Sequence, residues 1–488
     1  MKIGNIPREV QSVSEKLEEA GFEAYLVGGC VRDLILGKQP KDWDLTTSAT
    51  PEQIQTVFPD SFYENDFGTV GVKTDSENPL LAVIEVTPYR KEGKYTDARR
   101  PDDVSWAKTL SEDLERRDFT VNALAYRLKD SALVDEHGGQ QDIEKKILRA
   151  VGNPTKRFQE DALRMMRAVR LSAELEFAIE TDTATALLEN ASQLEKISKE
   201  RIRDEFVRIL ETNTPMQALV ISQKLGLLKY IAPDLERGIG IDQNQAHSFD
   251  VYEHNMRTMQ HAADKEWALL IRVAGLFHDI SKPETRRWSD EKKDWTFHGH
   301  EVVGAKVTKK ILSDLRFSKE FSEKVVRLVR WHMFFSDPDQ ITLSAVRRMI
   351  RNVGEEHIWD LLNLRICDRI GTGRPKEQPF RFRKYKSMVE EALRDPISVQ
   401  MLNIDGDVLM KKLGIKAGPR IGWILHALLE EVLEDPKKNT ESYMETRAQE
   451  LEKLSDDELK ALGESGKETR KKEEEEAIKA IREKHHVD

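Results

Sequence analysis

The hydrophobic periodicity of this chain changes at Asn153-Pro154, and that change constrains the fold more than any other sequence feature. Before it, short segments rich in Val, Ile, Leu and Tyr alternate with segments of helical periodicity, which is typical of a mixed α/β domain. After it, from Phe158 to about Leu228, apolar residues recur at helical spacing with almost no Gly or Pro. The sequence therefore predicts an α/β head followed by helical domains.

The length of the chain predicts several domains, because one domain usually takes ~100–200 residues and this chain has 488. We expect an α/β head with a mixed sheet and helices at 1–150 and an all-α neck at 151–228. A histidine-rich helical body at 229–390 and a helical tail at 391–488 would follow. From Asp435 onward the chain is highly charged and almost free of aromatics, so we expect a solvated helix or a partly disordered tail there, not a core.

Charge and cysteine content limit the setting in which the chain works. Its net charge of −10 argues against a generally basic surface, so any nucleic-acid contact would need local basic patches. The two cysteines, Cys30 and Cys367, exclude a disulfide framework. No segment is apolar over the ~20 residues that a bilayer helix needs, and Met1–Glu15 lacks the apolar core of a signal peptide. We expect a cytoplasmic protein without membrane contact.

Within the head, the pattern predicts particular elements. Alternation and β-favoured residues predict strands at 24–27, 43–46 and 81–89. Helical periodicity predicts helices at 10–20 and 31–36.

Three carboxylates are candidates for a catalytic magnesium site. Asp42 and Asp44 flank Trp43, and residues two apart on a strand share a face, so both carboxylates would point the same way. Glu85, on a neighbouring strand, can add a third. Such a trio can hold two Mg²⁺ ions that lower the pKa of an attacking hydroxyl and neutralise a leaving pyrophosphate. The alternative is an acidic pair that only solvates a strand edge.

A diglycine turn precedes the acid pair. Gly28-Gly29 leads into a predicted helix, and bare backbone N–H groups at such a turn can hold a triphosphate. Arg32, in the first turn of that helix, can add a bidentate contact. Although such a turn alone often binds nothing, its closeness to the two aspartates favours a nucleotide site.

A second cluster, Glu160, Asp161 and Arg164, can select a base. Asp161 accepts and Arg164 donates hydrogen bonds, which complements the donor–acceptor edge of cytosine and of adenine. Guanine and uracil would leave buried groups unpaired, at a cost of ~1–3 kcal/mol each. Arg167 and Arg170 continue this face toward the triphosphate. The alternative is an ordinary intrahelical ion pair of ~0.3–0.5 kcal/mol.

Between these clusters lies a third candidate motif. Arg117 and Asp118 can contact the phosphates and the ribose 2′-hydroxyl, and Asn122 follows in the same motif as a further nucleotide contact.

These motifs together closely resemble the bacterial (class II) tRNA nucleotidyltransferases, the CCA-adding enzymes, of the polymerase-β-like superfamily. The resemblance covers roughly residues 24–228. It rests on Leu26-Val27-Gly28-Gly29-Cys30-Val31-Arg32-Asp33, the Asp42/Asp44 pair, Arg116-Arg117-Asp118-Phe119-Thr120-Val121-Asn122-Ala123, Asp135-Glu136-His137-Gly138-Gly139 and Glu160-Asp161-Ala162-Leu163-Arg164. The segment Glu200–Glu205 also matches a family element that is chiefly structural.

The resemblance implies template-independent transfer of CMP and AMP from CTP and ATP to the 3′ end of tRNA, with Mg²⁺ as cofactor and pyrophosphate released. It implies a catalytic head, a neck with the base template, and body and tail domains that grip the tRNA. Arg90–Pro101 resembles the family's flexible loop, needed for switching from C to A. Addition of A only or CC only, or poly(A) synthesis, stays open as an alternative.

The body carries a second resemblance, to the histidine–aspartate (HD) phosphohydrolase superfamily. It implies a metal site for Ni, Co or Mn whose ligands would be His254, His278, Asp279, His300, His332 and Asp368. Metal-dependent hydrolysis of phosphate esters or cyclic phosphodiesters is an additional alternative function. The other possibility is a degenerate helical scaffold with buried histidines.

A basic segment at Arg369–Lys386 is interleaved with Phe380, Phe382 and Tyr385. This composition predicts phosphate contacts and stacking surfaces for RNA. A solvated basic linker is the alternative.

Overall fold

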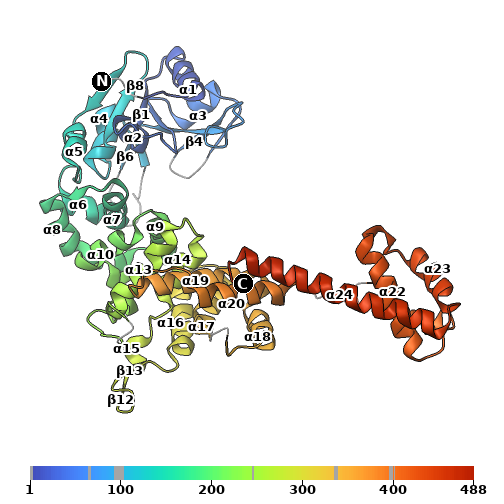
Figure 1. Cartoon of the computed structure of the whole chain (residues 1–488). Coiled ribbons are helices and arrows are strands. Elements are labelled where there is room, and N and C mark those ends of the chain that lie inside the picture. The colour runs from blue at the N-terminus through green and yellow to red at the C-terminus, as the bar shows by residue number, and fades with distance from the viewer. Residues whose placement is uncertain are drawn as a thin grey trace. The chain divides into compact units, whose positions relative to one another are not determined.

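The structure is a computed structural model that describes residues 4–63, 68–92, 104–244, 247–334, 339–394, 399 and 402–487. The chain divides into two compact units (Figure 1). The first contains Met1–His332 and Asn363–Pro375, and the second contains Met333–Leu362 and Lys376–Asp488. The expected head, neck and histidine cluster all belong to the first unit.

The head is built on a mixed seven-stranded sheet of order β3-β4-β5-β2-β1-β8-β9. Strands β2 and β5 are parallel, and the other neighbours are antiparallel. The strands are β1 (Ala24–Val27), β2 (Asp44–Thr47), β3 (Ser61–Tyr63), β4 (Val70–Lys73), β5 (Val83–Pro88), β8 (Leu124–Arg127) and β9 (Ala132–Asp135). A mixed sheet with helices is the fold class that the sequence predicts.

The two faces of this sheet differ in what covers them. Leu26, Leu45 and Val86 are neighbours in register and fully buried, and α1 (Arg8–Glu19) and α3 (Pro51–Val57) pack against this part of the head. Since side chains alternate along a strand, Asp44 and Glu85 lie on the opposite face.

Part of that opposite face is covered by α4 (Leu110–Glu115), which follows the small hairpin of β6 (Arg90–Glu92) and β7 (Val104–Trp106). Leu114 of α4 packs into a cluster with Tyr25, Val27 and Tyr89. The head also contains α2 (Gly29–Ile35), which starts at the diglycine turn, and α5 (Gly139–Lys145).

The first helix of the expected neck segment is α6. The side chain of Asn153 caps this helix by accepting from the N–H of Lys156, and Pro154 occupies the first turn. The neck helices are α6 (Pro154–Glu160), α7 (Leu163–Leu175), α8 (Thr181–Asn190), α9 (Lys199–Glu211) and α10 (Pro215–Lys224). The helical segment expected from Phe158 is therefore interrupted, and Asp161 stands between α6 and α7 in extended conformation.

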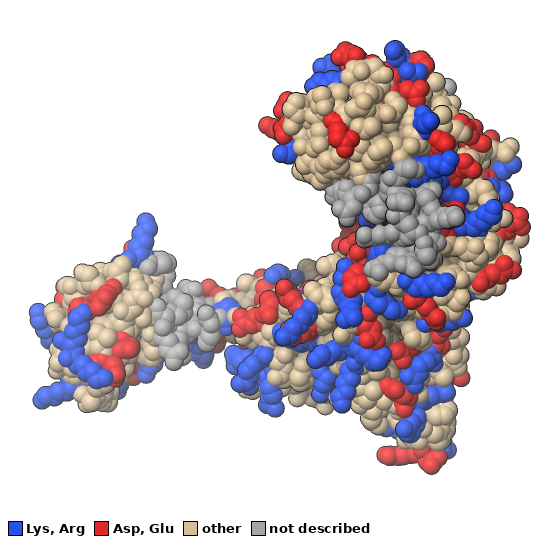
Figure 2. Space-filling model, turned by 180° about the vertical axis from the view of Figure 1, so that it is seen from behind, with Lys and Arg blue, Asp and Glu red and all other residues tan. Residues whose placement is uncertain are grey.

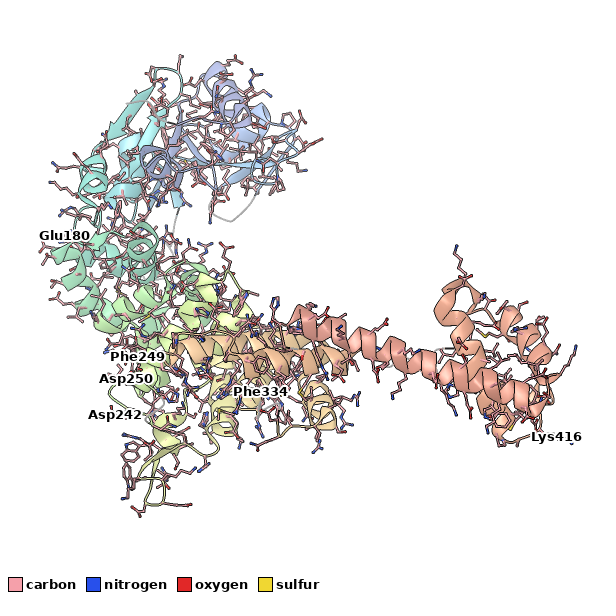
Figure 3. All side chains as sticks on the ribbon, in the orientation of Figure 1. Glu180, Asp242, Phe249, Asp250, Phe334 and Lys416 are labelled. Atoms are coloured by element: carbon pink, nitrogen blue, oxygen red, sulfur yellow. The ribbon has the colours of Figure 1, made fainter. Side chains whose placement is uncertain are left out.

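The body helices of the first unit bring the histidines together. They are α13 (Val251–Asp264), α14 (Leu269–Phe277), α15 (Lys282–Thr285), α16 (His300–Asp314), α17 (Lys319–Trp331) and the C-terminal part of α19 (Ile358–Gly371). Asp250 caps α13 by accepting from the N–H of Glu253, and Phe249 precedes it (Figure 3). A hairpin of β12 (Arg287–Ser289) and β13 (Asp294–Thr296) connects α15 to α16.

The second unit differs from the expected boundary at residue 390. It comprises α18 (Leu343–Val353), α20 (Phe380–Leu393), α21 (Gly406–Lys411), α22 (Pro419–Glu434), α23 (Glu441–Glu452) and α24 (Asp456–Lys484). Helix α20 joins this unit because it packs on α18 and α24, with Glu390 accepting from Lys484 and His485.

Two expectations about this unit are wrong. The charged C-terminal region is not without a core, because Met444, Leu451 and Leu459 pack with α22 in a buried cluster. In α20, Phe382 and Tyr385 are buried, so neither offers a stacking surface, and only Phe380 is largely exposed. The helical spacing of 382 and 385 places both rings on the covered face.

Figure 2 shows both acidic and basic side chains on the face that it draws. Among the described residues, no helix combines the length and apolarity that crossing a lipid bilayer requires.

Candidate active site and metal centre

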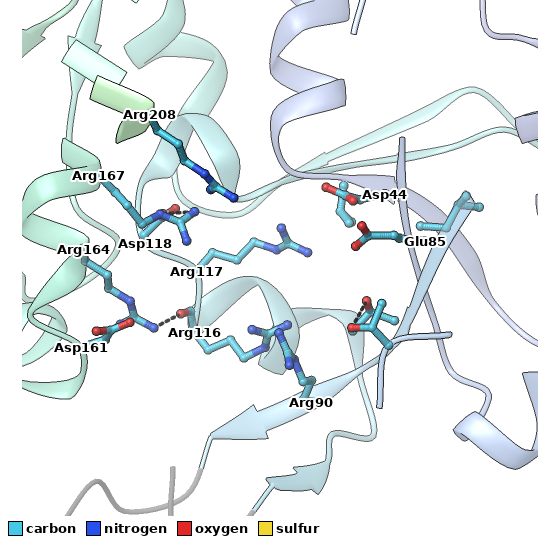
Figure 4. A pocket seen from close by; sticks show the side chains of 14 residues that line it. Asp44, Glu85, Arg90, Arg116, Arg117, Asp118, Asp161, Arg164, Arg167 and Arg208 are labelled. Carbon is cyan, nitrogen blue, oxygen red and sulfur yellow. Dashed lines mark hydrogen bonds and ion pairs between the residues drawn. The ribbon is translucent and has the colours of Figure 1, made fainter. Parts of the chain in front are cut away.

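A cavity of about 520 Å³ opens between the acidic face of the head sheet and the neck helices (Figure 4). It is lined by Val27, Asp44, Leu45, Thr69, Glu85, Thr87, Arg90, Arg116, Arg117, Asp118, Asp161, Arg164, Arg167 and Arg208. Carboxylates of the sheet lie at one side, and guanidinium groups point toward the cavity from β6, from the residues that follow α4, and from α7 and α9. Its volume is sufficient for a nucleotide-sized ligand.

Two of the three predicted catalytic carboxylates are direct neighbours. Asp44 and Glu85 are partners in the parallel pairing of β2 with β5, so their side chains share one face and both line the cavity. Asp42 lies in a bend before β2, not on the strand, and its side chain is exposed. Strand β2 begins only at Asp44, after the buried Trp43, which places Asp42 outside the regular alternation of faces.

The diglycine turn lies directly beside Asp44. Gly28 has a φ of 77°, and a Cβ atom there would be 3.0 Å from Nη1 of Arg117 and 3.8 Å from Oδ2 of Asp44. Arg32 donates to Asn122 at 2.7 Å and to Asp33, and it folds back on Gly29. The diglycine turn, Arg32 and Asn122 therefore lie together next to Asp44, although neither Arg32 nor Asn122 lines the cavity.

The motif around Arg117 joins the head to the neck. Asp118 forms an ion pair of 2.8 Å with Arg167 of α7 and accepts from Asn122. Burial alone would raise the pKa of the Asp118 carboxyl, but the charges of Arg167 and Arg164 lower it below its usual value. The carboxylate is therefore ionised and holds Arg167 at the cavity.

The predicted base-reading pair also lines the cavity, and both side chains have partners within the protein. Oδ2 of Asp161 accepts from Arg201 at 2.7 Å. Arg164 donates to Glu160 at 2.8 Å and to the carbonyl of Arg116 at 3.1 Å. Because Asp161 ends α6 and Arg164 begins α7, the two residues meet across a helix junction and not within one helix.

Arg170 is placed differently from the other predicted contacts. It pairs with Glu205 at 2.6 Å and with Glu174 at 2.9 Å, and it is not among the residues that line the cavity. The loop expected at Arg90–Pro101 lies outside the described residues from position 93 onward.

Sequence reasoning missed Arg208, and it included Arg90 and Arg116 only within the expected loop and a family motif, without placing either in the nucleotide site. Arg208 reaches the cavity from α9, seven residues after Arg201. Since seven residues make nearly two helical turns, Arg201 and Arg208 share a face, and this spacing is the signal that could have revealed it. The positions of Arg90 and Arg116 depend on the packing of α4 and carry no comparable signal.

The six histidine and aspartate residues of the body form one buried cluster. It divides into two potential metal positions, His254 with His278, Asp279 and Asp368, and Asp279 with His300 and His332. Oδ2 of Asp279 lies 3.1 and 3.2 Å from Nε2 of His254 and His278, and Oδ1 lies 3.1 Å from Nε2 of His300. Asp279 is thus placed to bridge two ions.

The hydrogen bonds of these histidines fit metal ligation. Nδ1 of His278, His300 and His332 each donates to a backbone carbonyl at 2.7–2.8 Å, which leaves Nε2 as the nitrogen that would ligate a metal ion. Nε2 of His300 and Nε2 of His332 then face each other at 3.2 Å, beside an Oδ1 of Asp279 that accepts no hydrogen bond from any described residue. A metal ion bound beside these three atoms would have two imidazole nitrogens and one carboxylate oxygen as ligands.

A head of this fold, with carboxylates facing an arginine-lined cavity, defines a nucleotidyltransferase. Residues 24–149 match the poly A polymerase head domain, residues 176–239 the probable RNA and SrmB-binding site of polymerase A, and residues 251–368 the HD domain. The CCA-adding enzyme of Limosilactobacillus reuteri is 33% identical over 93% of this chain and 100% of its own length. This chain belongs to the family of CCA-adding enzymes.

Two further relatives agree with this membership. The CCA-adding enzyme of Leuconostoc mesenteroides is 45% identical over 48% of this chain and 59% of its own length. The crystal structure of the Bacillus stearothermophilus CCA-adding enzyme in complex with CTP superimposes with a TM-score of 0.59 at 26% identity, covering 91% of this chain and 98% of that one. The resemblance to this family and to the HD domain, inferred from motifs, is therefore confirmed.

Proposed function

We propose that this chain adds CMP and AMP, taken from CTP and ATP, to the 3′ end of tRNA, with release of pyrophosphate. The observation that carries the proposal is the cavity itself, where Asp44 and Glu85 face arginines of the head and neck. The 3′-hydroxyl of the RNA loses its proton to water, and its oxygen forms a bond to the α-phosphorus. The bond from that phosphorus to the bridging oxygen breaks, and pyrophosphate leaves.

The residues of the cavity divide this task. Asp44, Glu85 and the preceding Asp42 would hold divalent ions, for which Mg²⁺ is the proposed species because it prefers carboxylate and phosphate oxygens. Bound there, the metal would acidify the attacking hydroxyl and neutralise the leaving group. Gly28 and Gly29 would approach the triphosphate through their backbone.

The cationic groups would hold the triphosphate, and one acidic group would hold the sugar. Arg117 and Arg167 line the cavity and would bind phosphate oxygens. Arg32 and Arg170 do not line it, so as further proposed contacts of the nucleotide they would have to leave their present partners, Asn122 and Glu205. Asp118 would accept a hydrogen bond from the ribose 2′-hydroxyl, and Asn122, its hydrogen-bond partner, would orient it.

For base selection, Asp161 and Arg164 would form the acceptor–donor edge that fits C and A, with Glu160 holding Arg164. Substitution Asp161→Ala should relax selection against UTP and GTP, because the unpaired acceptor that penalises a wrong base is removed. Single-nucleotide incorporation by wild type and Asp161→Ala measures this. Unchanged selectivity would reject the assignment.

The decisive experiment for the reaction uses tRNA transcripts that lack CCA, CA or only A, each incubated with single nucleotides. We expect CMP on the first two and AMP on the third, whereas addition of A only or CC only, or a long A tail, would overturn full CCA addition. Asp44→Ala should abolish incorporation and leave tRNA binding intact. Asp60→Ala, which removes an exposed carboxylate of the head, is the matched control and should behave as wild type.

A second function, metal-dependent phosphohydrolysis, is favoured by the buried six-residue cluster of the body. Ligands of imidazole and carboxylate type suit Ni, Co or Mn and a pair of ions that activates water. Hydrolysis of a 2′,3′-cyclic nucleotide with each metal, by wild type and His278→Ala, tests it. His357→Ala removes a buried histidine outside the cluster and should leave any hydrolysis unchanged.

A further inference from the structure

Asp113 is a carboxylate that the proposed reaction does not use. It lies in α4 with a side chain that is 0% exposed, directly before Leu114, which anchors the helix on the sheet. It does not line the cavity. A fully buried carboxylate is costly unless it is paired, so its partners explain its presence.

Those partners are three of the arginines that line the cavity. Oδ1 accepts from Nε and Nη2 of Arg116, at 3.0 and 2.7 Å, and from the backbone N–H of Arg90 at 3.3 Å. Oδ2 accepts from Nη2 of Arg117 at 3.2 Å. One carboxylate thereby connects the start of β6 with two consecutive arginines after α4.

The charges of the cavity show why such a connection matters. Its lining contains six arginines and four acids, Asp44, Glu85, Asp118 and Asp161, so six minus four leaves an excess of two positive charges. Arginines this close repel one another when no anion is bound. The buried carboxylate of Asp113 offsets the repulsion between Arg116 and Arg117. It does not line the cavity, so an incoming triphosphate does not contact its negative charge.

The ionisation of Asp113 agrees with this arrangement. Burial alone would raise the pKa of its carboxyl, but the charges of Arg117 and Arg116 lower the pKa below its usual value. The group is therefore a permanent anion at neutral pH.

We infer that Asp113 is a positioning residue for the nucleotide: its buried carboxylate holds Arg116, Arg117 and the backbone of Arg90 in the orientation that receives the triphosphate. The inference rests on the proposed nucleotidyl transfer. Asp113 acts on the substrate only through these arginines, since it makes no contact with the cavity.

The test is Asp113→Asn, which keeps the shape of the side chain and removes its charge. We expect the KM for CTP and for ATP to rise about tenfold, as for loss of one charge-assisted contact, while kcat at saturating nucleotide falls by less than about threefold. The matched control is Asp142→Asn. Asp142 is also buried and paired with an arginine, Arg149, that does not line the cavity.

Two further measurements separate positioning from a loss of structure. In an Arg116→Ala/Arg117→Ala background, Asp113→Asn should change nucleotide binding by less than about twofold, because both guanidinium partners are absent and, among the described residues, only the bond to the backbone N–H of Arg90 remains. Binding of tRNA and the Tm of Asp113→Asn should match those of Asp142→Asn. An unchanged KM in Asp113→Asn, or an effect that persists in the double-alanine background, overturns the inference. If wild type itself binds no CTP, the proposed function fails instead.

Discussion

Gly28 shows how one backbone position can serve the nucleotide cavity. Its φ of 77° is a conformation that residues with a side chain rarely adopt. A Cβ atom added to Gly28 would lie 3.0 Å from Nη1 of Arg117 and 3.8 Å from Oδ2 of Asp44. A Cβ atom at this position would crowd Nη1 of Arg117 and shift, by a few tenths of an ångström, the guanidinium that we expect to hold phosphate. The glycine is needed for space as well as for conformation.

The substitution Gly28→Ala separates these two requirements when compared with Gly37→Ala. Gly37 has a φ of 70°, but a Cβ atom there meets nothing within 4 Å. Both substitutions should lower the free energy of unfolding by about 1 kcal/mol through backbone strain. Only Gly28→Ala should also weaken CTP binding, by about tenfold or more. Chemical denaturation and CTP titration of both variants check this, and equal CTP affinities would contradict it.

At this scale, sequence reasoning succeeded where a site depends on local spacing. The placement of Glu85 on a strand next to Asp44 was predicted, and so was the turn at Gly28, whereas the shared face expected for Asp42 and Asp44 was not found because Asp42 precedes the strand. The role of Asp113 could not be predicted, because its value depends on three arginines that only the packing of α4 brings to one place. The partner of Asp161, Arg201, is forty positions away and equally hidden.

Among the elements, α24 shows that a helix can be highly charged and still contribute to a core. Gly463 and Gly466 lie on the side that meets α22. A Cβ atom at Gly466 would be 2.3 Å from the carbonyl oxygen of His426, and one at Gly463 would be 2.7 Å from Cα of Trp423. The two helices therefore pack with their backbones in close contact.

This close contact predicts opposite effects for two glycine-to-alanine substitutions. Gly466→Ala should destabilise the second unit by about 1–3 kcal/mol, because the helices must move apart. Gly422→Ala, in α22 with nothing within 4 Å, should stabilise it by up to about 1 kcal/mol, since alanine is the better helix former. Hydrogen exchange of the amides in α22 and α24 measures both. A change of the same sign in the two variants would refute the packing argument.

Prediction of the elements from sequence was uneven for a physical reason. Strand β5 has six residues and β1 is apolar throughout, which makes both recognisable from sequence. Strand β2 has a single apolar residue, Leu45, and β3, β4, β8 and β9 also have only three or four residues each, so pairing with a neighbour defines their bounds. The C-terminal core was missed because its few apolar residues are spread over α23 and α24 among many charged ones.

For the molecule as a whole, two chemically distinct centres share the first unit without sharing a residue. The cavity of the head and neck uses residues up to Arg208, and the histidine cluster begins at His254. Each centre has its own carboxylates, so substitution of a metal ligand in one centre should leave the activity and metal content of the other unchanged.

We expect EDTA to abolish nucleotide addition and Mg²⁺ to restore it, because the oxygen ligands around Asp44 favour that ion. His278→Ala should lower the bound transition metal, measured by elemental analysis, and leave the rate of CMP incorporation within about twofold of wild type. A parallel fall of both quantities would show that the centres are coupled.

The path of the chain between the two units has a consequence for how such a protein can be divided. Asp368 belongs to a segment of the first unit, Asn363–Pro375, that is enclosed on both sides by segments of the second. During translation, the first segment of the second unit, Met333–Leu362, is therefore synthesised before Asp368, the last ligand of the histidine cluster in the sequence. For the same reason, a single recombination point cannot exchange either unit intact with a relative. Because segments of the two units alternate along the chain, we expect the coding sequences of both units to be inherited together.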